Sequence, residues 1–269
     1  MKLSIVIPAH NEQDCLEATV CTLVHRLSLD GIPHEVVIVN DNSTDGTLDL
    51  SARLARELET VRYINNSPPN GFGFAVRLGL LEFTGDAVAI VMADGSDDPQ
   101  DLVVGYRKLQ EGYDCAFGSR FIRNSQVLDY PKHKLLLNRA ANWFIKLIFG
   151  IRYNDVTNAF KLYRRPVIDG IQPILSHHFN LTVELPLKAI ARGYSYAVFP
   201  IRWYNRKAGI SKLKIKEMGS RYLFIVLYVW LEKHLSRGDY RAGKSISDMV
   251  PLRPDLAARA DSKVSQTPR

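Results

Sequence analysis

At 269 residues, with 46% hydrophobic and 23% charged residues, the chain can bury a full core, which excludes a disordered or fibrous protein. The net charge of +7 is unevenly distributed. Residues 1–115 carry 8 Lys and Arg against 18 Asp and Glu, whereas residues 116–269 carry 27 against 10. The basic half could meet nucleic acid, anionic lipid headgroups, or a polyphosphate ligand that the acidic half holds through a cation.

The start of the chain and its cysteines predict a protein of the reducing cytoplasm. The sequence opens with the apolar run LSIVI at residues 3–7 and lacks the basic start, long apolar stretch and cleavage site of a secretion signal. Cys15, Cys21 and Cys115 have no metal-binding spacing, so we expect buried thiols.

Short apolar runs alternate with helical patterns over the first 119 residues. Strands are predicted at residues 3–7, 35–39, 61–64, 87–92 and 114–119. Helices are predicted between them, including one at about 72–83 and one after Pro99. This order predicts an α/β fold with a mostly parallel sheet, whose ligands bind at the carboxyl ends of the strands.

The second half predicts fewer strands and more amphipathic helix. Helices are expected at 132–149 and 181–192, and strands at 159–164 and 196–201, the last of which should end the sheet. The helix at 132–149 interleaves apolar and basic residues, so it can belong to the core or lie on a membrane.

The most apolar stretch is RYLFIVLYVWL at 221–231, only about half of the roughly 20 residues that a membrane-spanning helix needs. Basic residues on both sides favour a membrane-interfacial helix at 211–235, and a helix packed on the domain is an equal alternative. We expect a nucleotide-binding domain at 1–210 and a flexible tail at 236–269, because the tail is polar and poorly periodic.

The first acidic segment, VNDNSTDGT at 39–47, follows a predicted strand and runs into a helix. Asp41 lies just past the strand end, where its carboxylate could accept hydrogen bonds from a base or a ribose. Turns of this composition also cap helices without binding anything. The glycines of NGFGFAVRLG at 70–79 precede a helix too, and either an anion or tight packing explains them.

The second acidic segment, VMADGSDDPQD at 91–101, places three acids before a helix begun by proline. Because clustered acids repel one another, a hard cation such as Mg²⁺ or Mn²⁺ would stabilise Asp94 and Asp97. Asp98 precedes Pro99, so we expect it to cap the helix.

These ordered segments resemble the family-2 glycosyltransferases of the GT-A (Rossmann-like) fold, most closely the dolichol- or polyprenol-phosphate mannose synthases. Two further segments resemble motifs of the same family: IPAHNE at 7–12 and FGSRF at 117–121. DVTNAFKLYRR at 155–165 and NRKAGISKL at 205–213 resemble late motifs found mainly in the lipid-phosphate branch.

The resemblance implies roles for individual residues. It places the nucleotide at Pro8, His10, Glu12 and Asp41 and a metal at Asp94, Ser96 and Asp97. It places phosphate groups at Arg120, Arg206, Ser211 and Lys212. Catalysis would then rest on Asp94, Arg120, Arg206 and Lys212.

The sequence departs from the family pattern at four positions. Met92 stands where the family's first metal-segment aspartate is usual, and Ser96 where a metal-binding Gln is frequent. His10 replaces a common Tyr, and Asn40 replaces the first acid of an Asp-Asp pair. Metal binding is therefore expected to be weaker, shifted toward Asp97, or supported chiefly by the diphosphate.

The implied reaction moves a hexose, with mannose favoured, from GDP-mannose or a UDP-hexose to a polyprenyl or dolichyl phosphate by an inverting displacement with Mg²⁺ or Mn²⁺. A lipid phosphate is already ionised, so no general base is needed. The protein would lie on the cytoplasmic face of a membrane, and the need for a separate membrane subunit stays open.

Three alternatives remain. A soluble family-2 transferase acting on a saccharide hydroxyl would need Glu184 or Asp155 as its base, although Glu184 could equally lie at the sugar or at the edge of the core. The loss of an acid at position 92 could instead leave a non-catalytic, membrane-docked nucleotide-binding protein. Nucleic-acid binding is not expected, because the aromatic residues near the late cations lie in an apolar helix and do not form a stacking surface.

Overall fold

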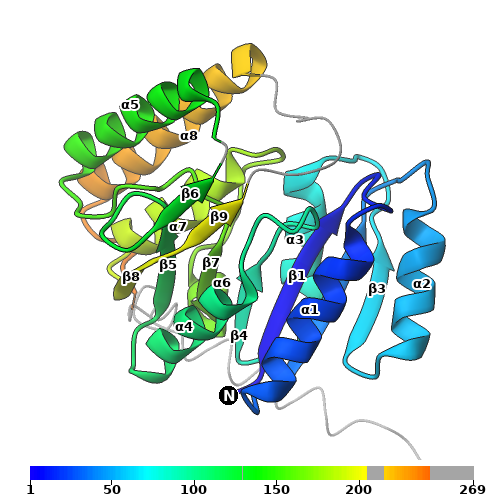
Figure 1. Cartoon of the computed structure of the whole chain (residues 1–269). Coiled ribbons are helices and arrows are strands. Elements are labelled where there is room, and N and C mark those ends of the chain that lie inside the picture. Colours follow the sequence, from blue (N-terminus) through cyan, green and yellow to red (C-terminus); the bar gives the residue numbers. More distant parts are fainter. Residues whose placement is uncertain (129, 205–214, 243–269) are drawn as a thin grey trace, which may run out of the picture.

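The computed structural model describes residues 1–128, 130–204 and 215–242, with side chains left out at 132–134 and 215–218. At its centre is a seven-stranded sheet of order β3-β2-β1-β4-β7-β5-β8 (Figure 1). Its strands are β1 (Leu3–Ala9), β2 (His34–Asn40), β3 (Val61–Asn65), β4 (Ala87–Ile90), β5 (Cys115–Ser119), β7 (Lys161–Arg164) and β8 (Tyr196–Pro200). Strand β7 pairs antiparallel with both neighbours and the other pairs in this sheet are parallel, which confirms the predicted mostly parallel sheet.

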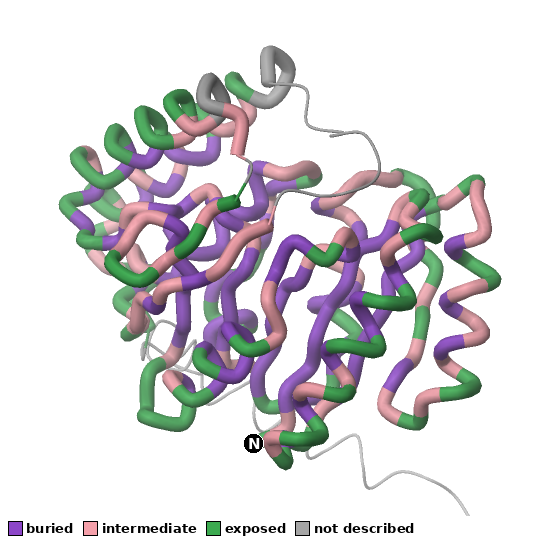
Figure 2. The backbone as a smooth tube through the Cα atoms, viewed as in Figure 1, coloured by how far each residue is buried: buried purple, intermediate pink, exposed green. Residues whose placement is uncertain are grey.

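Helices cover both faces of the sheet, which makes a three-layer α/β/α fold. One face carries α1 (Leu16–Leu29), α2 (Thr47–Glu57) and α4 (Pro99–Gln110). The other carries α3 (Phe72–Glu82), α5 (Lys132–Phe149), α6 (Arg165–Gly170), α7 (Leu181–Ala191) and α8 (Ile215–Leu235). Side chains alternate along the buried strands, so Ile5 and Ile7 enter one core and Val6 enters the other (Figure 2).

A second, two-stranded sheet joins β6 (Gln126–Leu128) to β9 (Arg202–Tyr204). The sequence did not predict it. Strand β8 closes the main sheet at one edge, as expected, but the chain continues directly into β9. There the Tyr204 amide donates to the Ser96 carbonyl at 3.2 Å, and Trp203 forms a β-bridge with Asp97. Strand β9 therefore lies against the loop that follows β4.

The two helices left open between core and membrane turn out to be partly buried. α5 has the predicted bounds and ends at Gly150, whose φ of 62° is a conformation in which glycine commonly ends helices. α8 packs one face on the core, which agrees with the expectation of a helix packed on the domain, and exposes apolar side chains on the other. Its position at a membrane interface stays a prediction. No helix within the described residues is long and apolar enough to cross a membrane.

One expectation from the sequence needs correction. The thiols are not all buried, because Cys21 is exposed on α1. The first residues of the predicted tail contact the domain: the Ala242 amide donates to the Arg192 carbonyl at 2.7 Å, and Arg192 lies over the Tyr240 ring. The flexibility of the tail stays a prediction. The rest of the tail, 243–269, lies outside the described residues.

Candidate functional site

The loops that follow β1 and β2 are hydrogen-bonded to each other. Asn11 Oδ1 accepts the Thr44 amide at 2.8 Å, and the His10 ring nitrogen Nδ1 lies 2.7 Å from the Asp41 carbonyl oxygen. The Glu12 amide donates to a hydroxyl of the second loop at 2.9 Å. These contacts bring together the residues predicted for the nucleotide, Pro8, His10, Glu12 and Asp41.

The Asp41 carboxylate is buried and is held by neutral donors. Its Oδ1 accepts from the Asn66 and Asn70 side chains at 2.7 and 3.2 Å and from the Gly71 amide at 3.1 Å. Its Oδ2 accepts from the Gly71 amide at 2.9 Å. Since each carboxylate oxygen can accept two bonds, Oδ2 keeps capacity for a ligand donor such as a base N–H. Sequence reasoning missed both asparagines, which come from the segment after β3.

The glycines after Asn70 serve packing. Gly71 has a φ of 140°, where L side chains are strained, and gives its amide to Asp41. A Cβ on Gly73 would lie 2.3 Å from the His177 carbonyl carbon. Phe72 stacks on Phe179 at 4.2 Å between ring centroids. Of the two readings given to these glycines, close packing is therefore the one that the structure supports.

The acids after β4 form a tight turn beside the amino end of α4. Asp94 Oδ1 accepts the Ser96 amide at 3.1 Å, and Asp97 Oδ2 accepts the Met92 amide at 3.0 Å. Asp98 caps α4 as expected, by accepting the Gln100 amide at 2.8 Å. Met92 therefore takes part through its backbone, although it has no carboxylate.

Asp97 connects the acids to the arginine at the end of β5. Burial raises the pKa of Asp97 to about 7. The Met92 amide and the Arg120 charge oppose this rise, and the Asp94 charge adds to it. Asp94 and Arg120 thus both act on one buried carboxyl, so the ends of β4 and β5 form one electrostatic site.

These acids fit a hard cation only with help from a ligand. Within the described residues, no group of three or more His, Cys, Asp or Glu could hold a metal ion. Asp94 and Asp97 supply oxygen donors, and Mg²⁺ commonly uses one or two carboxylates with phosphate and water as its other ligands. A cation would also relieve the repulsion between these two acids. The residues present therefore fit a metal that arrives with a diphosphate.

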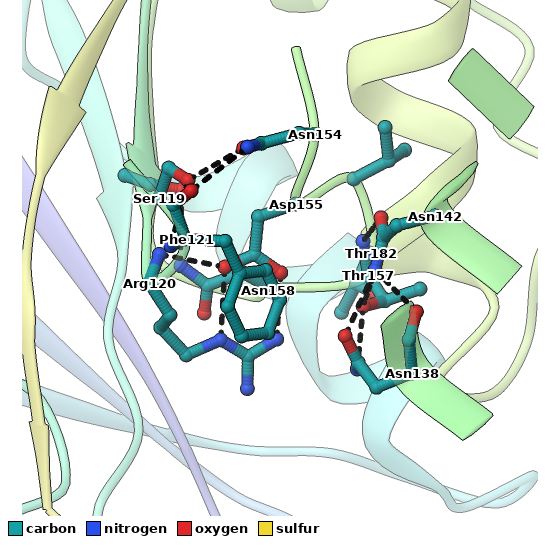
Figure 3. A network of polar contacts seen from close by, with 12 residues as sticks. Ser119, Arg120, Phe121, Asn138, Asn142, Asn154, Asp155, Thr157, Asn158 and Thr182 are labelled. Atoms are coloured by element: carbon teal, nitrogen blue, oxygen red, sulfur yellow. Dashed lines mark hydrogen bonds and ion pairs between the residues drawn. The ribbon is translucent and has the colours of Figure 1, made fainter. Parts of the chain in front are cut away.

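Arg120 forms a buried ion pair with Asp155 (Figure 3). The Arg120 Nε and Nη2 atoms donate to the two carboxylate oxygens of Asp155 at 2.9 and 2.7 Å, and the Arg120 amide donates at 2.9 Å. Burial opposes the charge of Arg120, but Asp155 outweighs it and raises the pKa of Arg120 further above its ordinary value. The side chains are 7% and 0% exposed, so this pair is a fixed part of the fold.

Three aromatic rings surround the Arg120 guanidinium. The centroids of Phe121, Tyr130 and Trp203 lie 5.3, 5.7 and 5.9 Å from its Cζ atom. Figure 3 shows the third guanidinium nitrogen, Nη1, turned away from Asp155, and within the described residues it has no hydrogen-bond partner. The arginine is thus held on one side and keeps one donor for an anion.

The bases required by the hydroxyl-acceptor alternative are both engaged elsewhere. Glu184 is 0% exposed and accepts the Leu175 and Ser176 amides at 2.7 and 2.6 Å. Its third partner is Lys188, at 2.8 Å. Asp155 is bound by Arg120. Glu184 is therefore a core carboxylate and does not face a sugar, and neither acid is placed as a base.

Three of the residues predicted for phosphate groups come from one short segment of the sequence, 206–212. Arg206, Ser211 and Lys212 lie outside the described residues. Strand β9 ends at Tyr204, just before them, and is anchored through Arg202 to Asp98 and Asp101 at 3.2 and 3.0 Å. No local pattern in the sequence marked the contact between Arg202 and Asp101, which are 101 residues apart.

Two curated relatives carry names that describe their reactions. The polyprenol monophosphomannose synthase of Mycolicibacterium smegmatis is 29% identical over 78% of this chain and 80% of its own length. The dolichol-phosphate mannosyltransferase of Pyrococcus furiosus is 29% identical over 80% of this chain, and the match spans 60% of that longer enzyme.

Solved structures of low identity share the fold. Glucosyl-3-phosphoglycerate synthase from Mycobacterium tuberculosis, crystallised with Mn²⁺, UDP and phosphoglyceric acid, matches with a TM-score of 0.64 and 16% identity over 86% of this chain and 78% of its own. The same enzyme with Mg²⁺ and UDP matches with a TM-score of 0.63 and 17% identity over 86% and 79%. The predicted GT-A fold is confirmed.

The comparison with family sequences covers most of the nucleotide and acidic segments described above. Glycosyl transferase family 2 matches residues 4–171, from β1 to the end of α6, which is more than half of the chain. This protein therefore belongs to glycosyl transferase family 2.

Proposed function

We propose that the protein transfers mannose from a nucleotide sugar to a polyprenyl or dolichyl phosphate by inverting displacement. The names of the two curated relatives support this substrate pair. One observation carries the proposal. Glu184 and Asp155, the two acids that could act as a base, are buried and engaged in hydrogen bonds or ion pairs. Arg120, in contrast, keeps one hydrogen-bond donor and lies close enough to Asp97 to affect its charge. Such a site suits an acceptor that is already ionised.

On the donor side, Asp41 with His10, Pro8 and Glu12 would hold the nucleoside, with GDP-mannose as the first candidate and a UDP-hexose as the second. Asp94 and Asp97 would hold Mg²⁺ or Mn²⁺, with the Ser96 turn shaping the loop between them. When bound, the metal would stabilise the negative charge of the departing nucleoside diphosphate.

On the acceptor side, the Arg120 Nη1 atom would donate to a phosphate oxygen. Asp155 and the aromatic rings would keep the guanidinium in place, so that a phosphate can be aligned behind the anomeric carbon without reorganisation. Arg206, Ser211 and Lys212 are proposed to complete phosphate binding. We further propose a peripheral position on the cytoplasmic face of a membrane, where the lipid substrate lies.

The test is transfer of radiolabelled mannose from GDP-mannose, with Mg²⁺ or Mn²⁺ and a polyprenyl phosphate, measured as label that partitions into organic solvent. Asp94→Asn is expected to lower the rate by about a hundredfold or more, the scale seen when one stabilising group at a developing charge is lost. Asp169→Asn, which changes an exposed acid on α6, serves as the matched control and should keep full activity.

The alternatives give different results in the same assay. Label that enters a water-soluble saccharide and never the lipid would favour the hydroxyl-acceptor transferase. Binding of nucleotide without turnover of any donor would favour a non-catalytic protein. Faster transfer to the lipid from UDP-glucose than from GDP-mannose would support the proposed lipid acceptor and show that the donor is a UDP-hexose.

A further inference from the structure

Helices α5 and α8 lie side by side at one end of the molecule, on the same core (Figure 1). On α5, Ile145 and Phe149 enter that core. The opposite side of α5 exposes large apolar side chains, each 43–71% accessible: Leu136, Leu137, Trp143, Phe144 and Leu147. Successive members are mostly one, three or four residues apart, as expected for one face of a helix.

Helix α8 repeats this arrangement. Ile225, Val226 and Val229 are buried in the core that α5 also covers. The opposite side of α8 exposes apolar side chains that are 46–68% accessible: Leu223, Phe224, Leu227, Leu231 and Leu235. Figure 2 shows exposed positions repeating along the outer side of both helices.

We call these ten side chains the α5–α8 apolar face. Single exposed leucines are ordinary on a protein surface, and the described residues have four outside this face: Leu29, Leu48, Leu81 and Leu128. Ten large apolar side chains on two adjacent helices are not ordinary, because extended apolar patches usually mark a contact with another protein or with a membrane.

Over 135–149 and 219–235, the exposed Lys and Arg side chains have no exposed acid among them. Arg139 and Lys146 are exposed on α5, and Lys233 is exposed in the last turn of α8. Beyond the end of α8, the exposed Arg237 is accompanied by the exposed Asp239. Over 135–149 and 219–235 the sequence has a single acid, Glu232, which is buried and paired with Arg192 through bonds of 2.8 and 3.0 Å. Within 135–149 and 219–235, no exposed acid balances the cations on these two helices.

We propose that the α5–α8 apolar face docks on a lipid bilayer that contains anionic headgroups. The apolar side chains would enter the boundary between headgroups and acyl chains, and the cations would meet lipid phosphates. A second copy of this chain fits less well, because a two-fold interface would bring two cationic rims together. The inference deepens the proposed function and depends on it only for the identity of the acceptor lipid.

The inner side of α5 connects this face to the candidate site. Asn138 and Asn142 donate to the Thr157 hydroxyl at 2.9 and 3.0 Å, and Thr157 lies two residues after Asp155, the partner of Arg120 (Figure 3). One helix thus presents apolar side chains outward and amides inward toward the arginine network. Docking through α5 would bring the phosphate of a membrane lipid to the end of the site that holds Arg120.

The experiment measures sedimentation of the purified full chain with phosphatidylcholine vesicles, with and without phosphatidylglycerol, in the absence of nucleotide. Wild type should bind the anionic vesicles more tightly, and added salt should weaken this binding. The double variant Trp143→Glu with Leu147→Glu should lower the partition coefficient at least about tenfold. The reason is that two apolar side chains proposed to enter the bilayer are replaced by anions. The matched control is Leu29→Glu with Leu81→Glu, which also puts acids at two exposed apolar positions and should bind like wild type.

A second variant tests the charges separately. Arg139→Glu with Lys146→Glu should weaken binding to anionic vesicles and leave binding to neutral vesicles unchanged. Equal binding by wild type and the Trp143–Leu147 variant would overturn the proposal. So would wild-type self-association in sedimentation velocity runs without vesicles, if the same two substitutions abolish it.

Transfer to a short, water-soluble prenyl phosphate separates this inference from the proposed function. The Trp143–Leu147 variant should retain wild-type transfer to the soluble acceptor and lose transfer to long-chain lipid in vesicles. Wild type that binds vesicles but transfers to neither acceptor would sink the proposed function and leave the docking surface intact. Loss of transfer to both acceptors by the variant alone would contradict a role confined to membrane docking.

Discussion

Two buried carboxylates mark two parts of the candidate site, and their partners differ. Asp41, after β2, is held by neutral amides from Asn66, Asn70 and Gly71. Asp155, after α5, is held by the Arg120 guanidinium. Neutral donors fix a carboxylate without cancelling its charge, so Asp41 can still attract ligand donors. An ion pair cancels the charge of the carboxylate. The carboxylate of Asp155 instead holds the Arg120 cation in position to bind an anion.

This difference follows the uneven distribution of charge along the chain. The acidic first half supplies Asp41, Asp94 and Asp97, which suit a base and a metal-bound diphosphate. The basic second half supplies Arg120 with aromatic rings around it, which suits a phosphate. Removing the charge of Asp155 should therefore affect mainly folding, whereas removing the charge of Asp41 should affect mainly ligand binding.

The largest expected effect comes from breaking the ion pair. Asp155→Asn leaves the Arg120 cation buried without a counter-charge, which should lower the free energy of unfolding by about 3–5 kcal/mol. Urea unfolding of the variant measures this value, with Asp169→Asn as the control on an exposed acid. A loss below about 1 kcal/mol, the range of exposed pairs, would show that water reaches the pair.

Glu35, at the amino end of β2, is another buried carboxylate, and it is held by both neutral and charged donors. Burial alone would raise its pKa, but hydrogen bonds from Ser4, Thr84 and Arg62 outweigh it and lower the pKa of Glu35 from 4.5 to about 2. Because the folded-state pKa is depressed, the stabilisation is present above pH 4.5 and is lost as the pH falls toward 2.

The shift corresponds to about 3 kcal/mol of unfolding free energy lost over that window. Urea unfolding between pH 6 and the lowest pH at which the protein stays folded measures the slope. Glu35→Gln should reduce this pH dependence and lower stability at neutral pH. An unchanged slope in the variant would mean that other acids cause the acid sensitivity.

The smallest effect on folding should come from Asp41→Asn, because its partners are neutral. The NH₂ group of the new asparagine would face the N–H donors that now bind the Asp41 carboxylate, which should lower the free energy of unfolding by about 1–2 kcal/mol. The larger consequence should be weaker nucleotide binding, seen as loss of the thermal stabilisation that GDP or UDP gives to wild type. Stability lost as heavily as in Asp155→Asn, with nucleotide binding intact, would reverse the comparison between the two regions.

The sequence alone determined most of the local elements of the main sheet and its helices, and much of the nucleotide side. The alternation of strands and helices, the bounds of α5, and the cap that Asp98 makes before Pro99 depend on neighbouring residues, so periodicity and helix-start signals were sufficient. Asp41 and Asp94 could be named because each follows a strand, and parallel strands end at the same edge. Family resemblance supplied the expected roles.

Only the tertiary structure decided which residues serve these sites as partners. Asp155 lies 35 residues after Arg120, and Asn66 lies 25 after Asp41, so no local spacing predicts either contact. Strand β9 and its bridge to Asp97 depend equally on long-range pairing. The outward face of α8 was undecided for the same reason: an apolar helix is buried or exposed according to what packs against it, which here is the core on one side only.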